Sequence, residues 1–262
     1  FVLPNSLKSA LIPAMAGIPR RIGWRGEYRY KLLTDLRILH EARFPRMIDR
    51  YMALGFPANL ALSANQLPEA PLFPRLKMDE ASQANLVSTY GLDPARLVAL
   101  CPGAEFGPAK QWPLDRFSDL ATRLIDAEHQ VILLGSPNDA DDVEQLINQV
   151  AKAKRKSLVN LTGLTSIPEA VDLIGLSKAV VTHDSGLMHV AAATGRPLVA
   201  LFGPSSPAHT PPLSETAVTL THLVPCHPCF ERECPLKHQA CLSELSVDEV
   251  FEALLQQIQR IA

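Results

Sequence analysis

The hydrophobic positions of the chain alternate between two patterns from residue 97 onward. Short apolar runs end at glycine, proline or polar residues, which is typical of buried parallel strands. Each run precedes a segment with apolar positions at i, i+3 and i+4, the pattern of a helix that packs on one face. The predicted strands cover residues 97–100, 131–134, 158–161, 179–182 and 197–202. Strands and helices in this alternation predict an α/β fold with a doubly wound parallel sheet.

Residues 1–63 form a different block, with one expected strand and with helices expected around residues 31–43 and 46–62. The chain starts with apolar residues, as though it began inside a strand, so we expect part of this domain to lie upstream. Prolines follow between residues 66 and 78, and we predict a linker region over residues 64–95. The second domain would then span residues 96–262. A cleft between two such domains is a common ligand site.

Composition narrows the function classes. With 262 residues, 47% of them hydrophobic and 20% charged, the chain can bury a full core, which excludes global disorder. The net charge of −2 gives no footprint for non-specific nucleic-acid binding, so we expect no nucleic-acid partner. No apolar run approaches the roughly 18 residues of a membrane span, and no signal peptide opens the chain. We therefore expect a cytoplasmic protein without a transmembrane segment.

Residues 182–189 place an Asp-Ser-Gly sequence between a predicted strand and a predicted helix. Free amides at a helix start bind anions, and these would lie at the carboxyl end of the sheet, where ligands bind. Gly186 would let a phosphate approach the backbone, and Asp184 would accept hydrogen bonds from sugar hydroxyls. An ordinary helix N-cap would use the same residues, so the motif alone leaves both interpretations open.

The loop over residues 102–113 is rich in glycine and proline and carries one lysine, Lys110. The loop lacks the Walker A spacing. A lysine at the carboxyl end of a sheet can nevertheless neutralise a diphosphate, which matters most when the diphosphate is a leaving group. The alternative, which the loop alone favours, is a solvated lysine beside a core Trp112.

Ser136 and Asp139 follow the second predicted strand of the sheet, and Gly163 and Leu164 follow the third. An acidic residue just past a strand often holds ribose hydroxyls, although a helix N-cap would look the same. Gly163 and Leu164 would flank a base or form a turn. The chain has no G-x-G-x-x-G and no G-x-S-x-G, which argues against a dinucleotide dehydrogenase and a serine hydrolase.

Arginines alternate with aromatic residues around glycines between residues 17 and 31. Arginine forks bind phosphate or carboxylate, and aromatic faces stack on sugar rings, so this segment suits an acidic, hydroxyl-rich ligand. A solvated basic face is the alternative. The glycines and Trp24 favour ligand contact.

Four of the five cysteines crowd into one segment, at Cys226, Cys229, Cys234 and Cys241. They are too few and too local for the disulfide framework of a secreted protein, and we expect them to be reduced. Their compact spacing predicts one structural zinc ion. The spacing fits no standard zinc finger, however, and a redox-labile loop is an equal alternative.

Together these segments resemble the ADP-heptose:lipopolysaccharide heptosyltransferases of glycosyltransferase family 9. The matching motifs keep the family's order along nearly the whole chain. They are LPNS at 3–6, KSA at 8–10, AGIP at 16–19, GWRGE at 23–27, RY at 29–30, the loop at 101–113, DSGLMH at 184–189 and FGPSSP at 202–207. The resemblance favours the ligand-binding interpretations of Asp184 and Lys110.

The resemblance implies a GT-B architecture of two Rossmann-like lobes, in which the N-terminal lobe binds the acceptor and the C-terminal lobe binds ADP-heptose. It implies an inverting enzyme that needs no cofactor for catalysis and moves L-glycero-D-manno-heptose onto the heptose of the lipopolysaccharide inner core. The acceptor, heptosyl-Kdo2-lipid A, would be met at the inner face of the inner membrane, with the enzyme peripheral to it.

The resemblance also assigns roles to residues. Lys110 would steady the diphosphate, Asp184 would bind the donor sugar and His189 would position it, which makes these three the expected catalytic residues. The expected donor site adds Glu105, Ser136, Asp139, Gly163, Leu164, Ser185, Gly186 and Leu187. The expected acceptor site consists of Arg21, Trp24, Arg25, Glu27 and Arg29. The family's general base is an Asp after the first strand, and we expect that strand to lie upstream. The N-terminal lobe would then be incomplete, and we expect the 262 residues alone to lack heptosyl transfer activity.

Two other function classes fit the same residues. One is another GT-B sugar-nucleotide enzyme, such as an epimerase, which would bind UDP. The other is a non-catalytic module that recognises ADP-sugars. Selective thermal stabilisation by ADP-heptose, ADP, UDP or NAD would separate them.

Overall fold

The computed structural model describes residues 1–60, 62–67 and 73–260. The chain forms two compact units, the first of residues 1–72 with 208–211 and the second of residues 73–207 with 212–262. The predicted linker region over 64–95 is divided between the two units. Helix α3 (Glu80–Tyr90) belongs to the second unit and contacts α6 (Ile167–Leu176), while residues 68–72 lie outside the described part.

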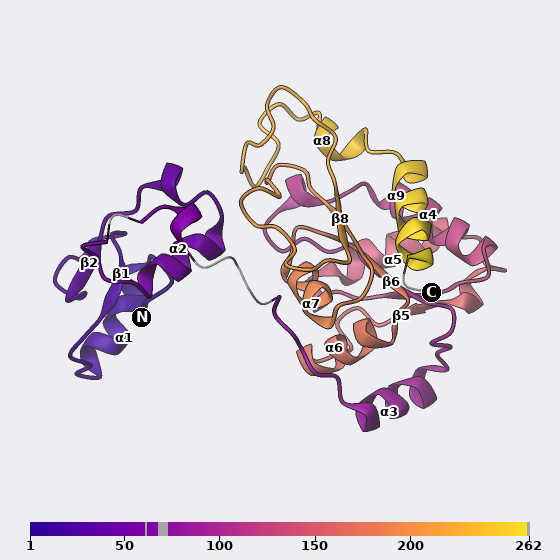
Figure 1. Cartoon of the computed structure of the whole chain (residues 1–262). Coiled ribbons are helices and arrows are strands. Elements are labelled where there is room, and N and C mark those ends of the chain that lie inside the picture. The colour runs from indigo at the N-terminus through magenta and orange to yellow at the C-terminus, as the bar shows by residue number, and fades with distance from the viewer. Residues whose placement is uncertain (61, 68–72, 261–262) are drawn as a thin grey trace. The chain divides into compact units, whose positions relative to one another are not determined.

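A six-stranded parallel sheet forms the centre of the second unit (Figure 1). Its strands are β3 (Leu97–Cys101), β4 (Gln130–Leu133), β5 (Leu158–Asn160), β6 (Ala179–His183), β7 (Leu198–Leu201) and β8 (Ala217–Leu220). They are arranged in the order β5-β4-β3-β6-β7-β8. The strand order reverses between β3 and β6, which pair from Val98 with Ala179 to Cys101 with Thr182. Ligands of doubly wound sheets bind at the carboxyl ends of the strands at this switch point.

Helices cover both faces of this sheet (Figure 1). On one face lie α4 (Leu114–Asp126), α5 (Ala140–Gln149) and α9 (Val247–Gln259), and on the other lie α3, α6 and α7 (Gly186–Thr194). Successive strand residues point to opposite faces, so Val98 and Leu100 join one core while Leu97 and Ala99 join the other. The predicted doubly wound sheet is confirmed, with β8 as an added strand that the apolar pattern did not mark. The residues of β8 are half-buried or exposed, as befits an edge strand.

The first unit contains α1 (Leu7–Met15), β1 (Ile22–Trp24), β2 (Asp35–Arg37) and α2 (Met47–Leu54), and β1 pairs with β2 in parallel. A 3₁₀ turn, Glu41–Arg43, precedes α2. No strand forms at residues 1–4, although the Val2 amide donates to the Ile22 carbonyl over 2.8 Å.

Two helix predictions in the first unit are corrected. The predicted helix over residues 31–43 is wrong, because β2 occupies its centre and Arg37 must reach across to α2. The Arg37 guanidinium donates to the carbonyls of Ala53, Leu54 and Phe56. The helix predicted over 46–62 ends at Leu54, since Gly55 caps it and Pro57 follows shortly. Among the described helices, none is long and apolar enough to cross a membrane.

Candidate nucleotide-sugar site

Lys110 and Asp184 meet at the switch point, although 74 positions separate them in the sequence. Lys110 ends a 3₁₀ turn (Pro108–Lys110) in the loop after β3, and Asp184 follows β6 directly. The Lys110 Nζ lies 2.6 Å from Asp184 Oδ2 and 3.3 Å from the Asp184 carbonyl oxygen. Both side chains are largely buried, with 15% and 8% of their surface exposed. The ammonium group also lies 4.8 Å from the centre of the Phe106 ring. The structure therefore brings two of the expected catalytic residues into one ion pair.

The start of α7 is open beside this pair. Ser185 is the N-cap residue, but its side chain caps no helix amide and instead pairs with the Thr182 hydroxyl at 3.2 Å. A Cβ placed on Gly186 would meet no atom within 4 Å. The first amides of a helix lack partners within the helix, so at α7 they can donate to an anion that approaches Gly186.

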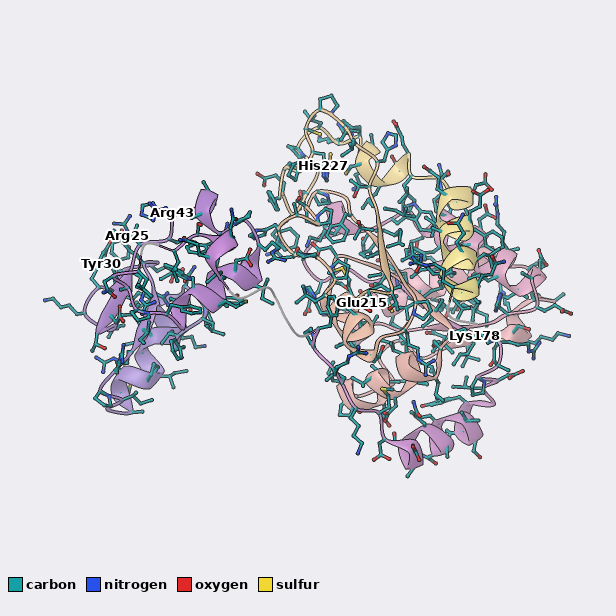
Figure 2. The ribbon with its side chains drawn as sticks, viewed as in Figure 1. Arg25, Tyr30, Arg43, Lys178, Glu215 and His227 are labelled. Atoms are coloured by element: carbon teal, nitrogen blue, oxygen red, sulfur yellow. The ribbon has the colours of Figure 1, made fainter. Side chains whose placement is uncertain are left out.

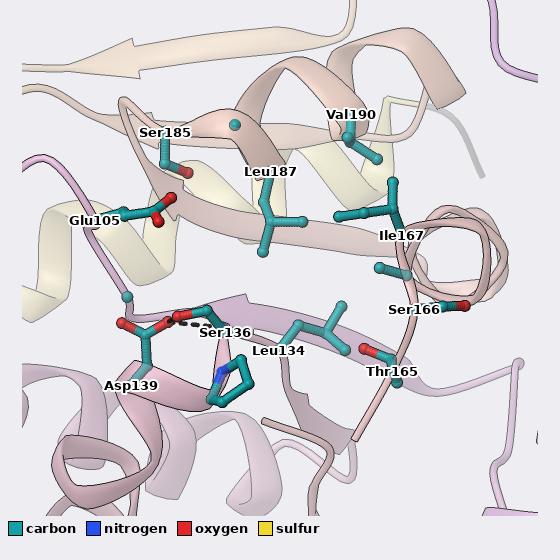
Figure 3. Close-up of a pocket in the computed structure, with 15 residues that line it drawn as sticks. Glu105, Leu134, Ser136, Asp139, Thr165, Ser166, Ile167, Ser185, Leu187 and Val190 are labelled. Carbon is teal, nitrogen blue, oxygen red and sulfur yellow. Dashed lines mark hydrogen bonds between the residues drawn. The ribbon is translucent and has the colours of Figure 1, made fainter. Parts of the chain in front are cut away.

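A pocket of about 480 Å³ lies between the loops that follow β3, β4, β5 and β6 (Figure 3). Six of the predicted donor residues line it, namely Glu105, Ser136, Asp139, Ser185, Gly186 and Leu187. Gly163 and Leu164 are not among its lining residues, although the Gly163 amide ties their loop to the Gly135 carbonyl over 3.0 Å. Figure 3 shows the Glu105 carboxylate directed toward Ser185. The sequence thus predicted much of the polar lining.

The apolar wall of the pocket was missed by the sequence analysis. It comprises Leu134, Ile167, Ala170 and Val190, together with the predicted Leu187. In Figure 3, Ile167, Leu187 and Val190 project from α6 and α7 into the same space. One cue to this wall was present in the sequence, since Ile167, a large aliphatic residue, directly follows the predicted N-cap Ser166. In the structure the Ile167 side chain is 69% exposed. Such a wall suits the flat face of a base.

Asp139 lines the pocket and also caps its own turn. Its Oδ2 accepts from the Ser136 amide and the Ser136 hydroxyl, each over 2.7 Å. The carboxylate also lies against Gly103, where a Cβ would come within 2.4 Å of it. Asp139 thus closes the capping box of its own 3₁₀ turn and does not cap the following helix through its side chain, while its contact with a ribose stays a prediction.

Two histidines flank Asp184 and differ in burial. His183 is fully buried, and burial lowers its pKa to about 4. His189 lies exposed in the first turn of α7. Desolvation lowers the pKa of His189, while the Asp184 carboxylate opposes that shift and Lys110 adds to it. His189 stays the expected positioning residue, on the helix that starts beside the ion pair.

Several predicted acceptor residues of the first unit have structural contacts. Arg29 is fully buried and donates to the carbonyls of Pro4 and Trp24 and to the Asn5 side chain. This burial lowers the pKa of Arg29. Trp24 is 6% exposed, and its indole donates to the Arg50 carbonyl over 3.0 Å. Both side chains thus have interior positions and partners within the first unit, and their contact with the acceptor stays a prediction.

Arg21 and Glu27 also support the backbone around them. Arg21 donates to the carbonyls of Ile18 and Leu32. The Glu27 carboxylate accepts from the Leu7 amide, in the first turn of α1, over 2.9 Å. Arg25 is exposed, as is Glu27, and no side-chain hydrogen bond to the backbone is described for it (Figure 2). Among the predicted acceptor residues, these two are exposed, and Arg25 has the positive charge that suits an anionic ligand.

The cysteine-rich segment, residues 226–241, packs against two loops of the second unit. His227 Nδ1 lies 2.8 Å from the Gly203 carbonyl, and Arg232 Nε donates to the Phe106 carbonyl over 2.7 Å. Its four cysteines are free thiols. Within the described residues, no three His, Cys, Asp or Glu side chains are grouped closely enough to hold a metal ion. The geometry thus does not support a zinc site, and zinc stays a prediction for elemental analysis of protein purified without chelator.

Comparisons with known proteins point to one family. A family model described as glycosyltransferase family 9 (heptosyltransferase) matches residues 1–240. Lipopolysaccharide heptosyltransferase 2 of Escherichia coli K12 is 43% identical over 97% of this chain and 73% of its own length. Lipooligosaccharide heptosyltransferase 2 of Haemophilus influenzae is 46% identical over 84% of this chain and 64% of its own length.

A solved structure extends the likeness to the fold. The E. coli ADP-heptose lps heptosyltransferase II matches with a TM-score of 0.89 and 41% identity, covering 99% of this chain and 76% of that one. The match confirms the expected GT-B type of fold. The chain therefore belongs to glycosyltransferase family 9, the heptosyltransferases, and is by family a sugar-transferring enzyme.

Proposed function

We propose that this glycosyltransferase moves heptose from ADP-heptose to the heptose of the lipopolysaccharide inner core. The observation that carries the proposal is the buried Lys110–Asp184 pair beside the open amides of α7, at the switch point of the sheet. Family membership and relatives named for heptose transfer in lipopolysaccharide synthesis support it. They also favour a transferase over an epimerase or a binding module.

In the proposed complex, the diphosphate of the donor lies against the amides of Gly186 and Leu187, and the Lys110 ammonium balances its charge. The adenine lies on the apolar wall near Ile167 and Val190. Asp139 accepts from the ribose with the oxygen that does not cap its turn. Asp139, the apolar wall and the start of α7 line one pocket, so a single nucleotide can contact all three. Lys110 does not line this pocket, but its partner Asp184 directly precedes Ser185, the N-cap residue of α7.

The proposed reaction is an in-line displacement, in which a hydroxyl of the acceptor heptose bonds to the anomeric carbon, gives up its proton to a general base and displaces ADP. Negative charge grows on the diphosphate as the glycosidic bond breaks, and fixed donors at that point lower the barrier. Lys110 and the α7 amides can supply these donors. Asp184 holds Lys110 in place and presents carboxylate oxygens to the hydroxyls of the donor sugar. His189, exposed nearby, positions the sugar.

We propose that the anionic acceptor, heptosyl-Kdo2-lipid A, binds the first unit through Arg25 and reaches it at the cytoplasmic face of the inner membrane. Arginine forks suit phosphate and carboxylate groups. Catalysis would need no metal, so a chelator should leave the transfer rate unchanged.

Turnover tests the proposal directly. The enzyme, expressed from its own gene, is incubated with ADP-heptose and heptosyl-Kdo2-lipid A, and both ADP release and the mass of the product are measured. We expect one heptose added per ADP released, with UDP-sugars giving no product. ADP release without a gain of heptose on the acceptor, or equal use of a UDP-sugar, would contradict the proposal.

A further inference from the structure

We propose that His183 is a positioning residue for Lys110, because its neutral imidazole joins the two ends of the loop that carries the lysine. This inference rests on the proposed function of the site. The loop leaves β3 at Pro102 and enters α4 after Pro113. His183 is the last residue of β6, the strand that pairs with β3.

The ring contacts both ends of the loop. Its Nε2 accepts from the Trp112 amide over 2.7 Å, and its Nδ1 faces the Gly103 carbonyl at 3.4 Å. A neutral ring protonated on Nδ1 satisfies both contacts, since one nitrogen then donates and the other accepts. A protonated, cationic ring would present a donor to the Trp112 amide and lose the shorter contact.

Packing fixes the orientation of the ring. His183 is fully buried, and Phe117 contacts it edge to face, with ring centres 5.3 Å apart and planes at 90°. Trp112 packs on the same Phe117 and anchors its indole on the Leu245 carbonyl over 3.0 Å. The imidazole therefore cannot turn away without disturbing the core under α4.

The next residue completes the arrangement. His183 holds the ends of the loop, while Asp184 binds Lys110, near the loop's end, over 2.6 Å. The last residue of β6 and the residue that follows it thus position the loop and its ammonium group. A displacement of about 1 Å in a binding group can cost up to about 100-fold in function, so a loosened loop should weaken diphosphate binding through Lys110.

The test compares His183→Gln, His183→Asn and His183→Leu in the full chain. The Gln side chain can place an acceptor near the Nε2 position, the Asn side chain reaches only the Nδ1 position, and Leu offers neither. ADP affinity is measured by isothermal titration, and folding by circular dichroism and thermal melting. Ser177→Ala is the control. Ser177 is as buried as His183, its hydroxyl donates to the Leu173 carbonyl, and it lies just before the start of β6, at the end of the strand away from the site.

We expect His183→Leu to weaken ADP binding about tenfold or more, His183→Asn to weaken it nearly as much, and His183→Gln to stay within about threefold of wild type. Ser177→Ala should lower the melting temperature and keep the ADP affinity. In a Lys110→Ala background, His183→Leu should change the affinity less than about twofold, because the two residues act through one contact.

The inference is overturned if His183→Leu weakens ADP binding equally with and without Lys110, or if it folds and binds ADP as wild type does. Should His183→Leu fail to fold, the comparison of Gln with Asn decides, and equal affinities for these two would overturn the inference. A wild-type chain that does not bind ADP at all would instead contradict the proposed function.

Discussion

At the scale of single residues, the central feature is an ion pair that burial makes expensive to break. Lys110 and Asp184 are largely buried, so removal of one leaves the other charge with poor solvation. The pair also carries the proposed contact with the diphosphate. Its stability and its function therefore depend on the same two groups.

Lys110→Ala should weaken ADP binding by about 10- to 100-fold, the range expected for one lost hydrogen bond to a charged group. Isothermal titration with ADP measures this. Lys178→Ala is the matched control, because Lys178 is exposed at the opposite end of β6 (Figure 2) and should not affect the affinity. Equal effects of the two substitutions would remove Lys110 from the site.

His183 predicts how stability changes with pH. Its pKa is about 4 in the folded chain, against about 6.5 in an unfolded chain. Above pH 6.5 the ring is neutral in both states and contributes no pH dependence. Between these values only the unfolded chain takes up the proton, so stability falls as the pH falls, and the loss reaches roughly 3 kcal/mol below pH 4.

Denaturant unfolding of wild type and His183→Gln between pH 7 and pH 4 tests this. The glutamine variant does not titrate, so the difference in unfolding free energy between the two proteins should shrink toward acidic pH. A difference that stays constant over this range would contradict a buried neutral His183.

At the scale of elements, the cysteine-rich segment packs against the loop that carries Lys110. The Ala109 amide donates to the Arg232 carbonyl over 3.1 Å, and the Arg232 guanidinium lies 5.6 Å from the centre of the Phe106 ring. The loop is thus held by two segments: the cysteine-rich segment bonds to Ala109, and His183 bonds to Trp112. The Phe106 ring has Lys110 and Arg232 as its two cationic neighbours.

Gly107→Ala should displace this loop and weaken ADP binding about tenfold. Gly107 has a φ of +154°, and a Cβ there would come within 2.5 Å of the Arg232 carbonyl oxygen. Gly91→Ala is the control, since Gly91 also has a positive φ of +61° but no atom within 4 Å of its Cβ position. Titration with ADP and thermal melting compare the two variants. An unchanged affinity in folded Gly107→Ala would show that the loop tolerates the shift.

The elements of the second unit were largely predictable from the sequence, because each strand of its centre is apolar on both faces and each helix has one apolar side. Leu97 and Val98 show this, since both are fully buried against different helices. In the first unit the pattern misled, because the strand β2 contains a buried arginine. Arg37 is stabilised by carbonyls at the end of α2, and this contact cannot be predicted from the residues near Arg37 in the sequence.

The candidate site was predictable where a loop residue has a distinct chemistry, as for Lys110 and Asp184. The resemblance to a family was needed to favour them over ordinary loop residues. The apolar wall and the role of His183 were not predicted, since both depend on which strands become neighbours. His183 contacts Gly103 and Trp112 only because β6 lies beside β3.

At the scale of the whole molecule, the two units divide the proposed task. The second unit holds the donor pocket, and the first unit holds the exposed Arg25 proposed for the acceptor. This division predicts that substitutions affect one substrate at a time. Most other predicted acceptor residues support the first unit's own backbone, so their loss should affect folding first.

Arg25→Gln should raise the KM for the lipid acceptor by about tenfold, as for one lost charge-assisted contact, and leave the KM for ADP-heptose unchanged. Arg25→Lys keeps the charge but loses the two-pronged guanidinium, so its KM for the acceptor should lie between those of wild type and Arg25→Gln. Steady-state rates of the enzyme expressed from its own gene, with each substrate varied in turn, provide the two constants. Equal changes in both constants would indicate damage to the fold rather than to an acceptor contact.

In the proposed function, the diphosphate of the donor binds at the switch point, between Lys110 and the start of α7. A crystal structure of the chain with ADP tests it most directly. We predict phosphate oxygens within about 3 Å of the Gly186 and Leu187 amide nitrogens and of Lys110 Nζ, with the adenine against Ile167. A diphosphate bound away from both Lys110 and the α7 amides would rule out the proposed donor site.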